Sequence, residues 1–297
     1  MATAALILVT AVWGITFVQV KDAVELYPLL AFLAIRYVIA TAALAPLAVR
    51  RLGGFGREGL VAGAVLGGLI ALGIGLQTAG LERTTVTSTG FITGLYVLFT
   101  PLLGLALFRT PIPRSLCAAV ALALLGLALL SGVPQGSGRG DLLVLISAFV
   151  QAFHIVMVER YANRFDVFAL TFVQVAAAAV AFGVVSLAFE ELTVPRGWTV
   201  WSALIVTGLF AVAFAYVVQV WAQRRVSATR IAIVFSLETV FAGLFGYLLA
   251  GDRLGALGFA GCAAIFAGIV VAEPAAASTL RRLVGRPAPE PGPLPPG

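Results

Sequence analysis

Residues 59–80 read GLVAGAVLGGLIALGIGLQTAG, a stretch without a charged side chain. The hydrocarbon core of a bilayer is about 30 Å thick, and one helical crossing needs about 20 consecutive apolar residues. A transmembrane β-barrel would instead need ~10-residue segments that alternate apolar and polar residues, whereas the apolar run here is continuous. This stretch therefore predicts a membrane-spanning helix.

Similar runs occupy most of the chain on either side of it. Of the 297 residues, 61% are hydrophobic and 11% are charged, and the mean hydropathy is +1.07. Soluble domains carry about 25% charged residues, so a water-soluble domain is excluded. We expect an all-α integral membrane protein with ten transmembrane helices. The predicted spans are residues 4–20, 29–49, 59–80, 86–108, 115–132, 141–158, 167–189, 199–222, 231–250 and 254–273.

The two ends of the chain differ in character. The start, MATAALILVT, lacks the basic region of a cleavable signal peptide, so we expect a retained first helix. Residues 274–297 contain three arginines followed by PAPEPGPLPPG, a composition typical of extended, solvated chain. We expect a disordered cytoplasmic tail there.

Basic residues between the spans predict the orientation, because cytoplasmic loops are enriched in Lys and Arg. With the N-terminus inside, 13 basic residues fall on the cytoplasmic side and 5 fall outside, which favours cytoplasmic termini. The cytoplasmic set is Arg50, Arg51, Arg57, Arg109, Arg114, Arg160, Arg164, Arg224, Arg225, Arg230, Arg281, Arg282 and Arg286. The outer set is Lys21, directly after the first span, with Arg83, Arg139, Arg196 and Arg253.

The second half of the chain weakly repeats the first at a nearly constant offset in the numbering. This offset aligns Arg36 with Gln174, and after a small drift in register it aligns Gly126 with Gly268. Few residues are identical, and the repeat is supported mainly by the matching span boundaries.

The repeat divides the chain into two units, residues 1–132 and 133–273, with five predicted helices each. Because five is odd, the second unit must enter the membrane in the opposite sense to the first. Inverted repeats are typical of alternating-access transporters, in which two similar halves open a shared site to either side of the membrane.

Three segments resemble the tandem units of the EamA-type proteins in the drug/metabolite transporter superfamily. They are AVWGITF at residues 11–17, GLERTTVTSTGFITGLYVLFTPLLG at 80–104 and SLETVFAGLFGYLLAGDRLG at 236–255. Two features depart from the family pattern: Thr239 stands where the second unit usually has proline, and the fourth helix exits sooner than the ninth.

The resemblance implies a ten-helix transporter in a bacterial inner membrane. It also implies a central cavity lined mainly by helices 1, 3, 4, 6, 8 and 9. Among the branches of the superfamily, bacterial exporters of aromatic and other amino acids are the most similar.

The sequence lacks the residues that ATP hydrolysis, metal binding and hydrolase chemistry require. The only lysine is Lys21, and no phosphate-binding loop surrounds it, so ATP hydrolysis is excluded. One histidine with two separated cysteines cannot form a metal site. Ser147 and His154 lack the G-x-S-x-G turn and the third partner of a hydrolase. We therefore expect a protein that is not an enzyme, needs no cofactor and binds no nucleic acid.

Polar residues on two predicted spans are candidates for a substrate cavity. Thr89, Thr93 and Tyr96 share one helical face, although the threonine hydroxyls can also bond to carbonyls of their own helix. Tyr216 and Gln219 form a second stripe, and a glutamine side chain cannot satisfy both ends of its amide in that way. Polar groups inside a membrane usually face partners or a wet cavity.

The repeat adds candidates at equivalent depths of the two halves. Trp13 and Phe17 lie one turn apart on the first span, and Gln151 and His154 lie on the sixth. Aromatic pairs at this spacing also occur in ordinary cores, and His154 fits either a hydrogen-bonded core position or a proton-coupling role. Gln77 on the third span is a further candidate.

Two charged residues lie within spans. We interpret Arg36 as structural, because the second helix is peripheral in the resembled family. Glu238 matches a glutamate common in that family, and it fits helix packing, proton coupling or binding of an amino group equally well. The cavity is therefore expected to be mostly uncharged, which argues against sugar phosphates and nucleotides.

These features predict a secondary transporter of small organic metabolites, an exporter of aromatic and other amino acids by alternating access. Its expected partners are a small-molecule substrate and the lipid bilayer, and the sequence leaves monomer and homodimer open. Two alternatives remain within transport: efflux of amphipathic compounds and proton-coupled metabolite transport. An alternative of another class is a membrane structural or assembly component, which buried, dry and paired side chains at Gln77, Gln151, Gln219 and Glu238 would favour.

Overall fold

The computed structural model describes residues 2–84, 86–131, 138–190, 193–249 and 255–272. Within these ranges the chain forms helices and short connections and contains no strand. Eight helices are long and apolar enough to cross a membrane, and two shorter apolar helices cover Arg114–Leu129 and Ala256–Ala272. The chain is therefore an all-helical, multi-pass membrane protein.

The first half begins with the long helix α1 and ends with α6. In chain order its elements are α1 (Ala2–Leu26), α2 (Leu29–Ala48), the 3₁₀ helix η1 (Val49–Gly54), α3 (Gly56–Leu81), α4 (Val86–Gly94), α5 (Tyr96–Phe108) and α6 (Arg114–Ser131). The second half comprises α7 (Gly138–Ala162), α8 (Val167–Phe189), α9 (Trp198–Val206), the π-helical segment η2 (Thr207–Phe214), α10 (Ala215–Gln223), α11 (Ala228–Phe235), α12 (Leu237–Leu249) and α13 (Ala256–Ala272).

Most predicted spans coincide with these helices, and α8 has the predicted bounds, residues 167–189. Lys21 is an exception, because it lies inside α1 and not after it. The apolar stretch ends near Lys21, but helical hydrogen bonding continues beyond it to Leu26. The predicted boundary at residue 133 and the predicted tail at 274–297 lie outside the described residues.

Two predicted spans are interrupted near their middles. The turn at Leu95 separates α4 from α5, and the turn at Ser236 separates α11 from α12. Both turns contain tight i→i−3 bonds, from Leu98 N to the Leu95 carbonyl and from Thr239 N to the Ser236 carbonyl. The sequence predicts continuous helices here because Gly94, beside the first break, is one of many glycines in the apolar runs, and no proline or glycine lies beside Ser236.

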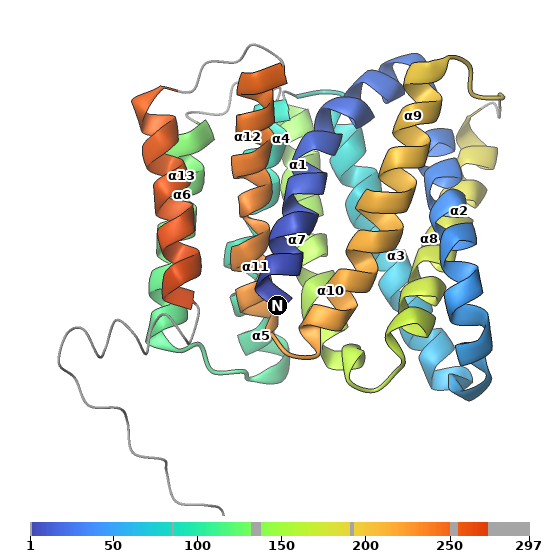
Figure 1. Cartoon of the computed structure of the whole chain (residues 1–297), viewed down its shortest axis with the longest axis horizontal. Helices are drawn as coiled ribbons and strands as arrows, with labels where there is room; N and C mark the ends of the chain where they lie inside the picture. The colour runs from blue at the N-terminus through green and yellow to red at the C-terminus, as the bar shows by residue number, and fades with distance from the viewer. Residues whose placement is uncertain (1, 85, 132–137, 191–192, 250–254, 273–297) are drawn as a thin grey trace, which may run out of the picture.

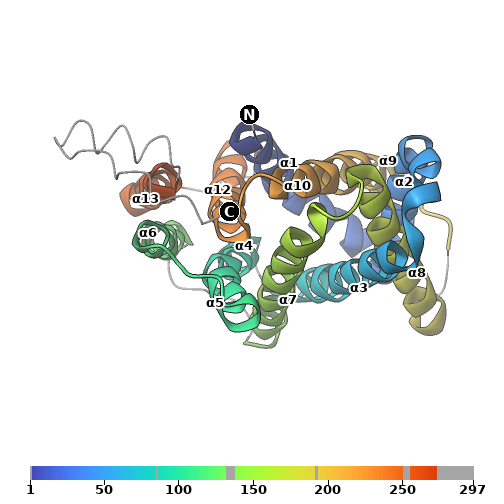
Figure 2. The ribbon, with the colours of Figure 1, turned by 90° about the horizontal axis from the view of Figure 1, so that it is seen from below.

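The helices form a broad bundle (Figure 1). In both views α6 and α13 lie side by side at one end, and α2 and α8 lie together at the other (Figure 2). Between them α3 packs on α7 and α8, while α1 packs on α12, η2 and α9. These contacts place α1, α3, α7 and the η2–α10 segment between the two helix pairs at the ends of the bundle.

The α6–α13 pair makes a reciprocal contact through two glycines. A Cβ atom on Gly126 would lie 2.6 Å from the Gly261 carbonyl oxygen, and one on Gly268 would lie 2.9 Å from the Ala119 carbonyl oxygen. The register that aligns Gly126 with Gly268 also aligns Ala119 with Gly261. Each helix thus presents the same surface to the other.

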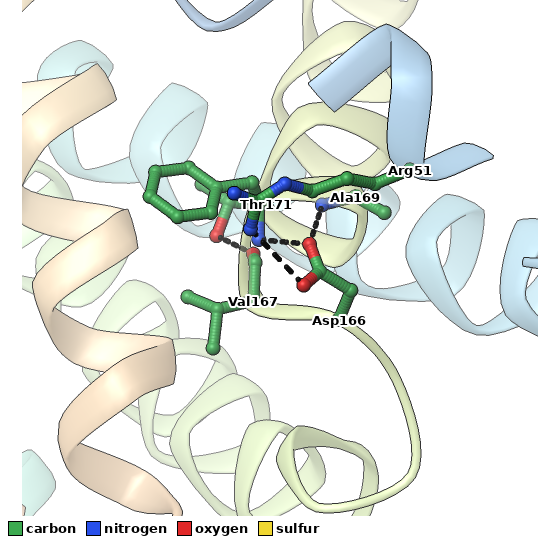
Figure 3. Close-up of polar contacts among 6 residues, drawn as sticks. Arg51, Asp166, Val167, Ala169 and Thr171 are labelled. Carbon is green, nitrogen blue, oxygen red and sulfur yellow. Dashed lines mark hydrogen bonds and ion pairs between the residues drawn. The ribbon is translucent and has the colours of Figure 1, made fainter. Parts of the chain in front are cut away.

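Acidic residues cap the α2–α8 pair at both ends. Asp166 accepts hydrogen bonds from the backbone N–H groups of Phe168 and Ala169 at 2.9 and 3.1 Å, and it forms an ion pair with Arg51 at 3.2 Å (Figure 3). At the other end of α8, Glu190 accepts from the N–H groups at the start of α2, Leu30 at 3.0 Å and Ala31 at 2.8 Å.

The two caps explain how α2 begins without a side-chain cap of its own. Pro28 precedes α2 at the position that Asp166 occupies before α8 in the repeat, and proline has no group to cap with. Free N–H groups at a helix N-terminus attract negative charge. Glu190, at the end of α8, therefore accepts the hydrogen bonds at the start of α2 that Pro28 cannot accept with its own side chain.

Candidate functional site

A cavity lies at the centre of the bundle, where α1, α3, α7 and the η2–α10 segment meet. It contains about 850 Å³ of empty space, open solvent at the mouth included, of which the centre of a water-sized sphere can reach about 80 Å³. Its wall consists of Trp13, Thr16, Phe17, Val20, Arg36, Tyr37, Leu69, Ile70, Ile74, Gln77, Thr78, Leu81, Tyr96, Gln151, His154, Ile155, Ala211, Tyr216, Gln219, Phe235 and Glu238.

Most sequence-predicted site residues meet in this wall. Trp13, Phe17, Gln77, Tyr96, Gln151, His154, Tyr216, Gln219 and Glu238 all line it. Thr89 and Thr93 are buried but lie outside the wall. Both threonines are buried against other parts of the protein and do not face the cavity. Thr93 contacts the wall indirectly, because its hydroxyl accepts a hydrogen bond from the wall residue Gln77.

Trp13 joins α1 to the π-helical segment η2. Its indole N–H donates to the Ala211 carbonyl at 2.8 Å, and its ring packs edge-on against Phe235 at 4.8 Å between centroids. A π-helical turn shifts the i→i−4 hydrogen-bond pattern and recurs at functional sites. Trp13 thus connects the wall to the irregular segment of the eighth predicted span, the α9–η2–α10 helix.

Gln151 and Ser147 make the equivalent connection in the other half. Gln151 donates to the Ser147 hydroxyl at 2.8 Å, and Ser147 donates to the Gly73 carbonyl on α3 at 2.8 Å. The repeat aligns Trp13 with Gln151 and Gly73 with Ala211. In the predicted repeat, these two carbonyls are equivalent positions, and different side chains bond to them.

The remaining amides of the wall are also hydrogen-bonded. Gln77 donates to the Thr93 hydroxyl at 2.9 Å. Gln219 donates to Gln223 at 3.1 Å, and Gln223 donates to the Ile155 carbonyl at 2.7 Å. These bonds fix the amide orientations across α3, α4, α7 and α10.

His154 is held between two neighbours. Its Nε2 atom lies 3.1 Å from the Oε1 atom of Gln174, and its ring meets Tyr216 edge-on at 5.8 Å between centroids. The residue is 5% exposed. His154 is therefore a buried, hydrogen-bonded residue that also borders the cavity.

Both charged residues within spans belong to the cavity wall. Glu238 accepts a hydrogen bond from the Tyr96 hydroxyl at 3.4 Å. Arg36 borders the same cavity from α2, beside Tyr37. The sequence interprets Arg36 as a structural residue of a peripheral helix, and the structure adds that it borders the cavity, where α2 packs against η2 at Gly208. The wall is mostly uncharged, with Arg36 and Glu238 as its two formally charged residues.

The cavity extends unequally toward the two ends of the bundle. Val20 and Leu81 in its wall lie near the ends of α1 and α3, at the end of the molecule that includes Pro28. The opposite end, which includes η1, is filled by an apolar cluster of Phe55, Leu66, Val158, Ala162, Val167, Ala169, Leu170 and Val220. We call this group the η1-end cluster.

Two ion pairs cover the η1-end cluster. Arg51 pairs with Asp166 at 3.2 Å, and Arg164 pairs with Glu58 at 3.1 Å. Each joins a residue of the first half to one of the second. Within the described ranges, no group of three His, Cys, Asp or Glu side chains is arranged to hold a metal ion.

The sequence profile of the EamA-like transporter family matches residues 1–132 and residues 138–272. The chain belongs to this family. A relative from Archaeoglobus fulgidus, described as an uncharacterized transporter, is 30% identical over 269 residues, which cover 90% of this chain and 83% of that protein. Both comparisons therefore identify the chain as a transporter-family protein.

Solved structures include the same fold. One protein crystal structure superposes with a TM-score of 0.75 at 19% identity, and the match covers 95% of this chain and 98% of the other. At 19% identity this similarity shows a shared fold and nothing about function.

Proposed function

We propose that the protein exports small organic metabolites, aromatic and other amino acids among them, across a bacterial inner membrane by alternating access. The observation that carries the proposal is the central cavity, whose wall combines aromatic rings with amides, a guanidinium and a carboxylate. Such a mixture suits solutes that are partly apolar and partly charged. Both termini lie in the cytoplasm in this proposal.

Reciprocal contacts support two inverted five-helix units as its moving parts. Gly126 and Gly268 pack on equivalent positions of each other's helix. Trp13 and the Ser147–Gln151 pair likewise bridge to equivalent carbonyls. Contacts of this kind are expected when two similar units are related by an approximate two-fold axis. The eight long and two shorter apolar helices then make up ten crossings.

The shape of the cavity supports an outward-facing arrangement. With cytoplasmic termini, the end that includes Pro28 lies outside and the η1-end cluster lies inside. The cavity extends toward the outside, and the cluster with its two ion pairs closes the inside. Export then requires the opposite arrangement, in which the η1 end opens to load substrate.

Counterflow in proteoliposomes tests the transport proposal. Vesicles loaded with one unlabelled amino acid should accumulate the labelled form, and a panel of amino acids and amphipathic amines identifies the substrates. Ile74→Trp places a large ring in the cavity wall and should abolish counterflow. Ile146→Trp, at a position 43% exposed on α7, is the matched control and should leave it intact.

The alternative of a structural component receives partial support. Gln77, Gln151 and Gln219 are paired within the protein, as that alternative requires. All three nevertheless border the cavity, and the Nε atom of Arg36 in the same wall has no such partner among the described residues. A complete lack of counterflow for every solute in the panel would favour the structural alternative.

Energy coupling is proposed to be facilitated exchange without a strict need for a proton gradient. His154 and Glu238 are the candidate proton carriers, but each is engaged by a neutral partner, Gln174 and Tyr96. Among the described residues, no second carboxylate borders the cavity to pass a proton on. Accumulation that requires an imposed pH difference, and that disappears in Glu238→Gln or His154→Gln, would contradict this part of the proposal.

A further inference from the structure

Arg36 is a buried cation with no partner of opposite charge among the described residues. It is 8% exposed, and its Nε atom is enclosed without an acceptor. The ion pairs of the described residues do not include it. Tyr37 is an aromatic neighbour, whose ring centroid lies 6.0 Å from the guanidinium carbon. A buried charge is costly unless it is paired and hydrogen-bonded.

The repeat shows what is missing around Arg36. Gln174 occupies the equivalent position in the second half, and its partner His154 is equivalent in the same register to Thr16. His154 engages Gln174 at 3.1 Å, whereas the Thr16 hydroxyl donates to the Trp13 carbonyl of its own helix at 2.9 Å. In the second half, His154 therefore bonds to Gln174. In the first half, the equivalent residue Thr16 does not bond to Arg36.

Glu238 provides a negative charge in the same wall. It accepts a hydrogen bond from Tyr96, and no Lys, Arg or His among the described residues forms an ion pair with it. Arg36 and Glu238 do not form an ion pair with each other, although both border the same cavity, as Tyr216 does. The cavity wall thus contains a positive and a negative group that do not form an ion pair with each other.

We propose that Arg36 binds the carboxylate and Glu238 the ammonium group of a zwitterionic substrate, with its side chain against Trp13, Phe17 and Phe235. A guanidinium offers two parallel N–H donors that match a carboxylate, which makes the contact strong and directional. The inference rests on the proposed transport function and deepens it by assigning the carboxylate and the ammonium group of an α-amino acid to two residues of the cavity wall.

Three ligands that share one side chain separate the two subsites. L-Phenylalanine carries both charged groups, phenethylamine lacks the carboxylate, and 3-phenylpropionate lacks the amine. Binding to the purified protein is measured by the rise in melting temperature with ligand concentration. We expect L-phenylalanine to bind at least ten-fold more tightly than either single-charge analogue, and equal binding of all three would overturn the inference.

Variants assign each subsite to its residue. Arg36→Gln should weaken L-phenylalanine binding about ten-fold or more and leave phenethylamine binding unchanged. Glu238→Gln should weaken L-phenylalanine binding and leave 3-phenylpropionate binding unchanged. Arg225→Gln is the matched control, because Arg225 is exposed and donates to the Trp221 carbonyl at 3.1 Å, and it should change neither.

The melting temperature of the ligand-free protein separates this role from a structural one. Arg36→Met removes an unpaired buried charge, so it should raise that melting temperature while it weakens L-phenylalanine binding. A lower melting temperature with unchanged binding would overturn the inference. Stabilisation by chloride or sulfate alone to the same extent as by L-phenylalanine would also overturn it, since Arg36 would then be an inorganic anion site.

Counterflow distinguishes failure of this inference from failure of the transport proposal. If the protein exchanges phenethylamine as well as phenylalanine, and Arg36→Gln has no effect on either, transport stands and the role of Arg36 falls. If wild-type protein exchanges no solute but binds L-phenylalanine through Arg36, the subsite stands and transport falls. The two results cannot be confused, because one reads exchange and the other reads binding.

Discussion

Trp13 illustrates how one side chain both shapes and stabilises the cavity. Its N–H reaches a backbone carbonyl of η2, and its ring covers Phe235. A single hydrogen bond contributes about 1 kcal/mol to stability, and more is lost when a buried acceptor is left unsatisfied. The position of α1 against η2 therefore depends on an atom that phenylalanine lacks.

Trp13→Phe should lower the free energy of unfolding by about 1–2 kcal/mol, because the aromatic packing remains and the bond to Ala211 is lost. Equilibrium unfolding in detergent measures the change. Trp198→Phe is the control, since Trp198 is 80% exposed, and it should stay within about 0.5 kcal/mol of wild type. Equal effects of both substitutions would show that the Trp13 bond contributes nothing.

Sequence alone located much of the cavity wall at this scale. Tyr216 and Gln219 stood out because polar residues are rare on an apolar helix and must face inward. Arg36 was visible too, but its direction was not, because α2 is apolar on all sides and offers no polar face that would orient it. Its equivalence to the buried Gln174 was the available signal, since inverted units place equivalent positions at equivalent depths.

Among the elements, α6 and α13 show how small residues set a close helix contact. Their reciprocal glycines bring each backbone within reach of the other helix. Helix association in a membrane relies on such close packing, because lipid is as apolar as the side chains. The contact therefore depends on the absence of a Cβ atom at two positions.

Gly126→Ala and Gly268→Ala should each destabilise the protein by about 1–3 kcal/mol, since the added methyl groups would overlap backbone atoms of the partner helix. Gly183→Ala in α8 has open space around the new Cβ and should be neutral or stabilising, because alanine favours the helix. Melting temperatures of the three variants measure the difference. If the melting temperature fell equally in all three variants, the close contact between α6 and α13 would not be the cause of the destabilisation.

The irregular parts of elements were the least predictable from sequence. Gly94 beside the first break resembles the many other glycines of the spans, nothing at Ser236 marks a break, and the π-helical segment at 207–214 reads as an ordinary apolar run. These features arise from tertiary contacts, such as the bond from Thr239 to the Gly90 carbonyl at 2.9 Å, which joins the two broken spans. Local periodicity does not contain such information.

For the whole molecule, the orientation in the membrane is the first property to test. In a background of Cys117→Ala and Cys262→Ala, a cysteine at Val194, which is 76% exposed, should react with an impermeant maleimide from outside. A cysteine at the exposed Gly53 in η1 should react only after the membrane is opened. The reverse pattern would contradict the charge count, and labelling of both from one side would contradict the fold.

The two ion pairs at the η1 end give a second test at this scale. Arg51 and Arg164 are 46% and 49% exposed, so replacing both by Gln should cost at most about 1 kcal/mol of stability. Because each pair joins the two halves over the η1-end cluster, their loss should favour opening. A cysteine at the buried Val158 should then react faster from the cytoplasmic side, and an unchanged rate would deny the pairs a role in closure.

The unequal bridges of the two halves have a thermodynamic consequence. Under alternating access, two identical halves would exchange conformations at no cost, and the empty protein would face each side for half of the time. Here an indole serves one half and a serine–glutamine pair serves the other. A difference of about 1.4 kcal/mol between such contacts gives a tenfold excess of one orientation. The resting direction of the empty protein is thus encoded where its two half-sequences have diverged.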